Sequence, residues 1–348
     1  MTCNHRATRG RSALHYEEEA SGKGRARRPY IANPDLVERL ATGPPLAEVG
    51  WETVYGSGPR GDFDYPAIHS IVSEVLGSWA SLIGAEYLIM KLTSNTILIT
   101  GGGSGIGYEL TKQLTALGNT ILITGRDQAK MDRAKAAFPK VHTFRSDVSD
   151  PKAIATLYEN VTKQFPELNI LINNAGIMRE INIHDKAGSL EDITREIEIN
   201  LSGPIRMVKQ FLSHLKTKSE AAIMNVSSGL AFVPLPISPV YCATKAGLHS
   251  FTESLRVQLK NTKVKVFELA PPATQTELLG AFNSEDMKGV SIMKVEDMVK
   301  VAVKGMQTDR FEIRPGQANQ LKMMSRVAPG FILKQMSRSV DRMLGIHN

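Results

Sequence analysis

The sequence predicts an α/β fold, a doubly wound parallel sheet with helices on both faces. From Met90 onward, short apolar runs alternate with longer stretches of helical periodicity. The first apolar run enters a glycine-rich turn and then a helix, as is typical of parallel sheets. Seven strands are expected, at Thr96–Thr100, Thr120–Thr124, Val141–Phe144, Ile170–Asn173, Ala221–Val226, Val264–Leu269 and Phe311–Arg314.

Composition limits the classes of function. The 348 residues are 42% hydrophobic and 22% charged, enough for one large core. Cys3 and Cys242 form no disulfide framework and suit a reducing, cytoplasmic location. Residues 1–89 carry a net charge of −2 and the remainder +9. A basic body suits an anionic cofactor or a nucleic acid, and because no aromatic-and-basic nucleic-acid module is visible, we expect the cofactor.

Residues 1–89 are predicted to be a poorly structured N-terminal extension, followed by one domain over residues 90–348. Residues 1–30 are polar, lack periodicity and show no secretory signal pattern, so we expect disorder. Between Ile68 and Leu92 the uncharged span, Val75–Ala85, has 11 residues. A membrane span needs about 20, so a linker helix is expected.

Residues 28–66 contain the segments Arg28-Pro29-Tyr30, Asn33-Pro34-Asp35-Leu36 and Thr53-Val54-Tyr55-Gly56. With these segments, residues 28–66 resemble a C-terminal fragment of Old Yellow Enzyme-type flavin reductases. An intact flavin-binding barrel needs roughly 250 residues. We therefore interpret this segment as a remnant or fusion scar and expect no flavin site.

The glycine-rich turn after Thr96–Thr100 is the first candidate binding site. Such a turn directs backbone N–H groups and the positive end of a helix dipole at a phosphate, which side chains would block. The spacing, Gly-x-x-x-Gly-x-Gly, differs from the common G-x-G-x-x-G, and a tight structural loop is the alternative. The residues expected to hold a dinucleotide here are Gly101, Gly103, Ser104, Gly105, Ile106 and Gly107.

The end of the second strand indicates which dinucleotide is bound. In NAD-type folds an acidic residue about 20 positions after the glycines binds the ribose hydroxyls. Here Arg126 occupies this region, and its guanidinium would pair with the 2′-phosphate of NADP. Asp127 is the objection, although it also suits the N-cap of a helix over Gln128–Ala137. The pattern favours NADP over NAD, and a solvated surface arginine is the alternative for Arg126.

Two further strand ends carry candidate cofactor contacts. Asp147 and Val148 follow the third strand, where a carboxylate could accept a hydrogen bond from an adenine amino group. Capping a helix that begins near Asp150 is the alternative for Asp147. The fourth strand leads into Asn174, Ala175 and Gly176, small and amide residues that let the backbone approach a ligand.

The strongest chemical pattern follows the fifth strand. Tyr241 and Lys245 are four residues apart in a helical stretch, so both point to one face. A free tyrosine has a pKa of about 10. A lysine ammonium, with a positive nicotinamide, would lower the pKa of Tyr241 and make it an acid/base for a carbonyl oxygen. Ser228 could hydrogen-bond the same oxygen. Cys242 has no partnered base and is expected to pack.

Together these motifs resemble the classical short-chain dehydrogenase/reductase family, over residues 90–348, and the segment Ser227–Pro234 and the tail resemble its DltE-like branch. The resemblance implies a Rossmann-type fold and an NADP-dependent oxidoreductase that interconverts a small-molecule carbonyl and an alcohol. It implies a homodimer or homotetramer. It assigns roles to five residues: Tyr241 is the acid/base, Lys245 binds the nicotinamide ribose, Ser228 orients the substrate, Asn200 positions a relay water and Thr276 contacts the carboxamide.

Two features of the sequence leave alternative interpretations open. Pro272 stands where the family has glycine, which puts the role of Thr276 in doubt. The tail, Leu321 to Leu344, is rich in Met, Leu, Lys and Arg, and a basic amphipathic helix could lie on a membrane surface or pack on protein. A catalytically weak NAD(P)-binding sensor and a membrane-associated regulatory protein are the alternative functions.

Overall fold

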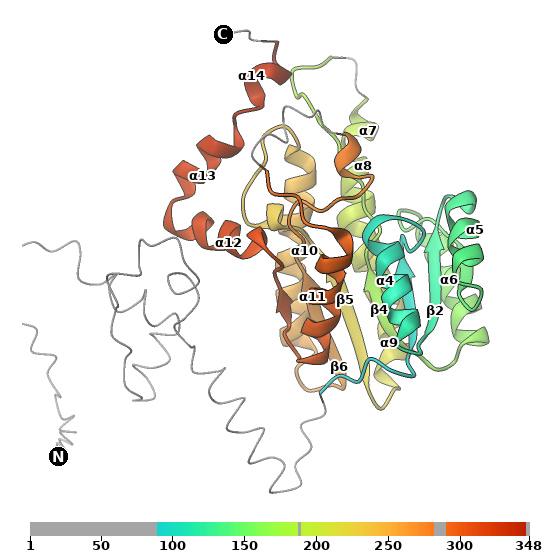
Figure 1. Ribbon diagram of the computed structural model, residues 1–348. Helices are drawn as coiled ribbons and strands as arrows, with labels where there is room; N and C mark the ends of the chain where they lie inside the picture. The colour runs from blue at the N-terminus through green and yellow to red at the C-terminus, as the bar shows by residue number, and fades with distance from the viewer. Residues whose placement is uncertain (1–88, 187–188, 282–289, 346–348) are drawn as a thin grey trace, which may run out of the picture. The chain divides into compact units, whose positions relative to one another are not determined.

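The computed structural model describes residues 89–186, 189–281 and 290–345, which all belong to one unit, Ile89–Asn348. Its centre is a seven-stranded parallel sheet of order β3-β2-β1-β4-β5-β6-β7 (Figure 1). The predicted fold class is confirmed, and every expected strand is present. The strands are β1 Thr96–Thr100, β2 Thr120–Gly125, β3 His142–Arg145, β4 Leu168–Asn173, β5 Ala221–Val226, β6 Val264–Leu269 and β7 Glu312–Ile313.

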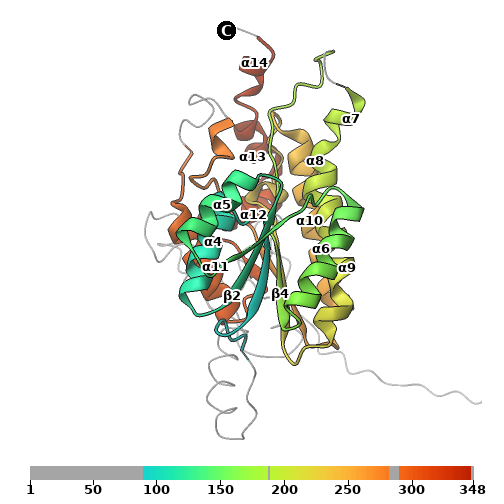
Figure 2. The same ribbon diagram turned by 90° about the vertical axis from the view of Figure 1, so that its right-hand side faces the viewer.

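Helices cover both faces of the sheet (Figure 2). On one face lie α4 Gly105–Ala116, α5 Gln128–Ala137 and α11 Val295–Gln307; on the other lie α6 Pro151–Gln164, α9 Gly203–Lys216 and α10 Pro239–Gln258. Alternate strand residues enter the two cores: Ile97 and Ile99 pack toward α4, whereas Leu98 packs toward α6 and α9. Strands buried on both faces explain why the sequence shows continuous apolar runs here.

The connections create a crevice at one edge of the sheet. From β1 the chain proceeds to β2 and β3 on one side, and then crosses to β4 on the other side of β1. The chain therefore leaves β1 toward β2 and leaves β4 toward β5, in opposite directions across the sheet. Doubly wound folds bind ligands at such a switch point.

Several short helices lie in the loops between strands, and others follow the last strand. They are α7 Leu190–Ile193, α8 Arg195–Ile197, the π-helix η1 Glu198–Ser202, and the 3₁₀ turns η2 Gly229–Ala231 and η3 Leu279–Ala281. The tail, in which a basic amphipathic helix was considered, contains three helices: α12 Gln317–Val327, α13 Pro329–Met336 and α14 Val340–Met343. Ala328 is non-helical, with φ of −143° and ψ of 61°, because the residue before a proline is kept out of the helical region.

The expectations for the N-terminal extension lie outside the described residues. These are disorder over residues 1–30, the flavin-reductase-like segment 28–66 and most of the expected linker helix. Within the part of the chain that the structure describes, no helix has the length and apolar character needed to cross a bilayer.

Candidate active site

The glycine turn between β1 and α4 is shaped by close backbone contacts. Gly101 and Gly105 have φ of +66° and +52°, in the left-handed region that favours glycine. At Gly107 an added Cβ would lie 2.2 Å from the carbonyl oxygen of Gly101. Only glycine lets the start of α4 approach the turn this closely.

The loop after β4 is fastened to the same turn. The Nδ2 atom of Asn174 donates to the carbonyl oxygen of Thr100 at 2.9 Å. The Oγ1 atom of Thr100 accepts from the backbone nitrogens of Asn174 and Ala175, at 2.9 and 3.0 Å. The predicted amide-and-glycine loop is thus part of the crevice floor, and its next residue, Gly176, lies against Asn200.

The start of α4 has the properties of an anion site. Ser104 is the N-cap residue, but its side chain accepts no hydrogen bond from the first turn of the helix. The Ser104 side chain therefore leaves those N–H groups available, and an uncapped helix start of this kind is suited to binding an anion. Thr276 contacts Gly105 across the crevice, Gly103 lies against α5, and Ile106 packs against the core.

The residues expected at the adenosine end lie together. Arg126 follows β2, and its side chain is 47% exposed, with a guanidinium nitrogen 3.7 Å from a carboxylate oxygen of Asp147. Asp127 accepts a hydrogen bond from the backbone nitrogen of Lys130 at 3.1 Å and is the N-cap of α5. The helix-cap interpretation of Asp127 is confirmed, whereas Arg126 lies beside Asp147.

The loop after β3 is also ordered by its own side chains. Asp147 accepts from the backbone nitrogen and the hydroxyl of Ser149, at 2.9 and 2.7 Å. Asp150, not Asp147, caps α6. Val148 is buried and packs against Gly203 at the start of α9.

Asn200 lies fully buried in the π-helix η1. Its amide exchanges two hydrogen bonds with the backbone of Ile177, donating to the oxygen at 2.8 Å and accepting from the nitrogen at 2.9 Å. A π-bulge of this kind often marks a functional site, because it redirects a side chain. Here it turns Asn200 toward the loop after β4 and toward Thr244 of α10.

Tyr241, Lys245 and Ser228 converge at the end of β5. Lys245 lies over the ring of Tyr241, with the ammonium nitrogen 5.5 Å from the ring centroid. The same nitrogen donates to the carbonyl oxygen of Val226 at 2.8 Å. Ser228 follows two residues later and its hydroxyl forms a hydrogen bond with Tyr241. The structure therefore brings all four predicted catalytic residues to one edge of the sheet.

Burial governs the ionisation of this group. Desolvation raises the pKa of Tyr241 well above its usual value near 10, and the hydrogen bond with Ser228 only partly offsets this. Desolvation lowers the pKa of Lys245 from 10.5 to about 8. The lowered tyrosine pKa that we expected is therefore not produced by the protein's own groups, because burial outweighs the opposing effect of Ser228.

The surroundings of Tyr241 are apolar. Met178 and Cys242 are buried beside it, and Leu230, Leu235 and Leu278 pack against this cluster. Cys242 is a packing residue as expected, since burial raises its pKa to about 11. One acidic side chain is near: Glu196 is fully buried, and desolvation raises its pKa.

Comparison with known proteins identifies the family of the chain. The family model described as short chain dehydrogenase matches residues 95–287. The chain belongs to the short-chain dehydrogenase family. A relative of this dehydrogenase, the uncharacterised oxidoreductase DltE of Bacillus subtilis (strain 168), is 42% identical over 250 residues, which cover 71% of this chain and 98% of that protein.

Two solved structures are similar to this short-chain dehydrogenase. A short chain dehydrogenase from Burkholderia cenocepacia J2315 in complex with NADP matches with a TM-score of 0.62 at 22% identity, covering 71% of this chain and 99% of that one. A 3-ketoacyl-(acyl-carrier-protein) reductase from Brucella melitensis complexed with NADH matches with a TM-score of 0.58 at 28% identity, covering 62% and 92%.

The resemblance of residues 28–66 to flavin reductases is not supported. The family match begins at residue 95, after this segment ends. The interpretation of these residues as a flavin-reductase remnant is accordingly withdrawn.

Sequence reasoning missed three ionisable residues near the site, two of them buried and one, His249, partly buried. They are Glu196 on α8, His249 on α10 and Glu268 on β6. A signal existed for two of them: His249 lies four residues after Lys245, on the same helix face, and Glu268 follows the apolar pair Val266-Phe267 near the end of its strand. Glu196 lies in a short helical segment without clear periodicity, so no sequence signal pointed to it.

Proposed function

We propose that this dehydrogenase is an NADP-dependent oxidoreductase that interconverts a carbonyl and an alcohol, with Tyr241 as the acid/base. One observation carries the proposal. Asn200, Ser228, Tyr241 and Lys245 converge beside the glycine turn, at the carboxyl edge where doubly wound sheets bind ligands.

The proposal of a nicotinamide dinucleotide and the choice of NADP over NAD are supported by different observations. The similar structures hold NADP in one case and NADH in the other, which supports a nicotinamide dinucleotide without choosing between them. The choice of NADP rests on Arg126, which lies half-exposed after β2 while Asp127 is engaged as a helix cap. The turn from Gly101 to Gly107 would hold the pyrophosphate, Asp147 and Val148 the adenine, and Asn174 to Gly176 with Thr276 the nicotinamide half.

The protein's side chains would manage the proton and the substrate oxygen. The Ser228 and Tyr241 hydroxyls, already hydrogen-bonded, would both contact that oxygen, and Tyr241 would donate or take its proton. Lys245 would bind the nicotinamide ribose, and Asn200 would position a relay water. When bound, the nicotinamide supplies or takes the hydride. Because burial raises the pKa of Tyr241, its hydroxyl is held protonated and is suited to act as the acid in carbonyl reduction.

Assembly and location are part of the proposal. Exposed apolar side chains lie on the helices through which the family usually assembles: Leu190 is 88% exposed on α7, and Val257 is 65% exposed on α10. Burial of such residues between copies would stabilise a homodimer or homotetramer. We propose a cytoplasmic location, no nucleic-acid partner and a small-molecule substrate.

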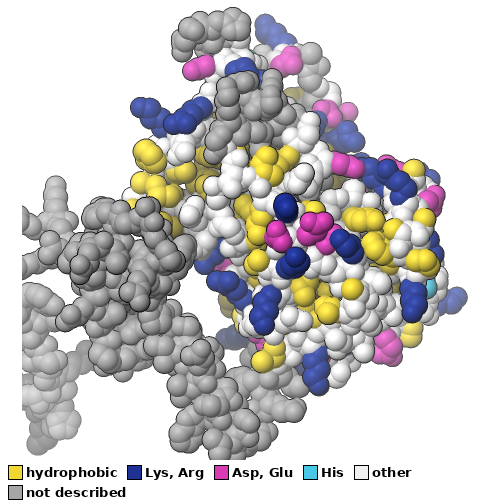
Figure 3. Space-filling model, in the orientation of Figure 1, with side chains coloured by type: hydrophobic (Ala, Val, Ile, Leu, Met, Phe, Trp, Pro, Cys, Tyr) yellow, Lys and Arg dark blue, Asp and Glu magenta, His cyan; other side chains and the backbone are white. Residues whose placement is uncertain are grey.

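A membrane-associated regulatory protein is the second candidate, favoured by the tail. Met323, Val327, Phe331 and Leu333 are exposed apolar residues on α12 and α13. Figure 3 shows hydrophobic side chains gathered over these helices, with lysines and arginines beside them. Such a surface suits an anionic lipid headgroup region, although it also suits a protein partner.

The test is a panel of aldehydes, ketones and alcohols with NADPH and NADH, followed by the absorbance of the reduced nicotinamide. We expect turnover of at least one carbonyl, faster with NADPH at equal concentration. Tight NADPH binding without turnover across the panel would favour a catalytically weak sensor.

A further inference from the structure

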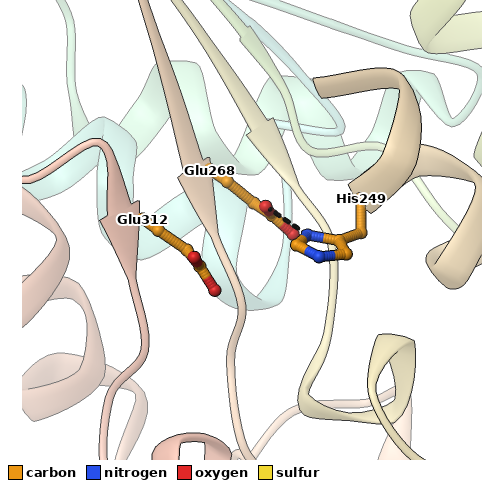
Figure 4. A group of neighbouring side chains, drawn as sticks. All are labelled: His249, Glu268 and Glu312. Carbon is orange, nitrogen blue, oxygen red and sulfur yellow. Dashed lines mark hydrogen bonds and ion pairs between the residues drawn. The ribbon is translucent and has the colours of Figure 1, made fainter. Parts of the chain in front are cut away.

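A group of three ionisable side chains, one buried and two partly buried, lies near the active site, outside the set that the proposed function uses. Glu268 on β6 is fully buried, and its Oε2 atom lies 2.7 Å from Nδ1 of His249 on α10 (Figure 4). The other oxygen of Glu268 accepts a hydrogen bond from the hydroxyl of Ser227 at 2.5 Å. Both oxygens of this carboxylate therefore have partners.

The third member of the group, Glu312, has its own cation. Lys322 of α12 donates to both carboxylate oxygens of Glu312, at 2.5 and 2.7 Å, and lies 5.1 Å from the ring centroid of Phe232. His249, Glu268 and Glu312 could together offer three ligand atoms to a metal ion. Because a hydrogen-bond donor already satisfies each carboxylate, the group is better explained as two adjoining charge pairs.

The pair formed by Glu268 and His249 closes a ring with a proposed catalytic residue. Lys245 donates to the carbonyl oxygen of Val226, and the next residue, Ser227, donates to Glu268. Glu268 is bonded to His249, which lies one helical turn after Lys245 on the same helix. Strand β5, strand β6 and helix α10 are thus tied together immediately before Ser228.

We propose that Glu268 and His249 are positioning residues of the active site, which hold the end of β5 and the ammonium of Lys245 in register so that Ser228 and Tyr241 meet at the substrate oxygen. The inference rests on the proposed function. Glu268 acts through Ser227, whose neighbour is Ser228, and through its negative charge near Lys245. His249 acts by keeping that carboxylate oriented and compensated.

The charged groups around the ring determine in which direction the pKa of Lys245 should change when Glu268 is neutralised. Among the described residues, Lys245 faces Tyr241 on its own helix and Glu268 from β6. His249 faces Glu253 on its own helix, Glu268 from β6, Glu312 from β7 and Lys322 from α12. Burial lowers the pKa of Lys245 to about 8, and the charge of Glu268 opposes this. Without that charge, the pKa of Lys245 falls further.

The decisive variant is Glu268→Gln in the full chain. Glutamine keeps the size of the side chain and can still bond Ser227 and a neutral His249, so the fold is expected to persist. We expect kcat with NADPH to fall by about 10- to 100-fold, since a 1 Å misplacement of a catalytic group can cost about 100-fold. The alkaline limb of the kcat profile should move to lower pH, which a purely structural role would not produce.

Two further variants separate the parts of the ring. Ser227→Ala removes only the hydroxyl that bonds Glu268, so kcat should fall while the KM for NADPH and the alkaline limb stay close to the parent's. Glu253→Gln is the matched control, because this carboxylate faces the other nitrogen of His249, at 3.7 Å, from an exposed position. It should leave kcat and the pH profile unchanged.

The inference fails if Glu268→Gln keeps kcat within twofold and an unshifted alkaline limb. If that variant does not fold, an unchanged kcat in Ser227→Ala overturns the proposal. A different result contradicts the proposed function, namely retained turnover in Tyr241→Phe. An inactive Tyr241→Phe beside a fully active Glu268→Gln would therefore reject the positioning role alone.

Discussion

Replacing Lys245 by methionine should abolish turnover and yet relieve an electrostatic cost of folding. Lys245 is 4% exposed, and burial lowers its pKa from 10.5 to about 8. At about 1.4 kcal/mol for each pKa unit, this difference corresponds to about 3 kcal/mol against folding at neutral pH. Methionine has a similar shape and no charge to desolvate.

The sign of the pH dependence follows from the direction of the shift. Below pH 8 the lysine is protonated in both states and its whole cost is present. Between pH 8 and 10.5 the unfolded chain holds a proton that the folded protein has lost, so the parent gains stability as pH rises. Methionine lacks this gain. Losing the hydrogen bond to Val226 leaves a buried carbonyl unpaired, which costs about 1–3 kcal/mol.

The desolvation cost of Lys245 and the cost of the unpaired carbonyl together determine the expected difference in stability. At pH 7 the variant should be about as stable as the parent or up to about 2 kcal/mol more stable, by urea unfolding at matched concentration. Between pH 7 and pH 10, the free energy of unfolding of the variant should fall by about 2–3 kcal/mol relative to that of the parent. A difference between the two proteins that stays constant from pH 7 to pH 10 would refute the reasoning, because the cost would then not come from a buried charge.

Three more perturbations test the cofactor site and the domain boundary. Arg126→Asp should lower the ratio of NADPH affinity to NADH affinity at least tenfold, which corresponds to about 1.4 kcal/mol. The control Asp127→Asn keeps the helix cap and should leave this ratio unchanged. If calorimetry shows the reverse pattern, the site is of the NAD type. Gly107→Ala should weaken NADPH binding at least tenfold, since its Cβ would lie 2.2 Å from the oxygen of Gly101, and parent-like affinity would contradict the close approach. Deletion of residues 1–89 should leave turnover within about twofold, and loss of folding or of NADPH binding would make the extension part of the domain.

The fold was predictable because its signals are local. Apolar runs and turn residues predicted strands Thr96–Thr100, Ala221–Val226 and Val264–Leu269 with the bounds that the structure shows. The crevice position followed from the glycine turn after the first strand. The amphipathic character of the tail did not predict its division into three helices, of which α12 and α13 are separated at Ala328, the residue before Pro329.

The ionisation of the site was not predictable, since it depends on tertiary burial. The spacing of Tyr241 and Lys245 correctly indicated one helix face, but it contains no measure of desolvation, which controls both pKa values. The ring through Glu268 joins residues from β5, β6 and α10, which are distant in the sequence. Only the packed sheet shows that they meet.

Turnover of the parent protein and of Tyr241→Phe, measured with NADPH and the best carbonyl of the panel, tests the central claim most directly. Phenylalanine keeps the packing of the ring among Met178 and its neighbours but removes the hydroxyl. We predict that kcat falls by about 100-fold or more, the usual contribution of a general acid, while NADPH affinity stays within about twofold. A variant that retains parent-like kcat would show that Tyr241 does not transfer the proton, and the account of the site would be wrong.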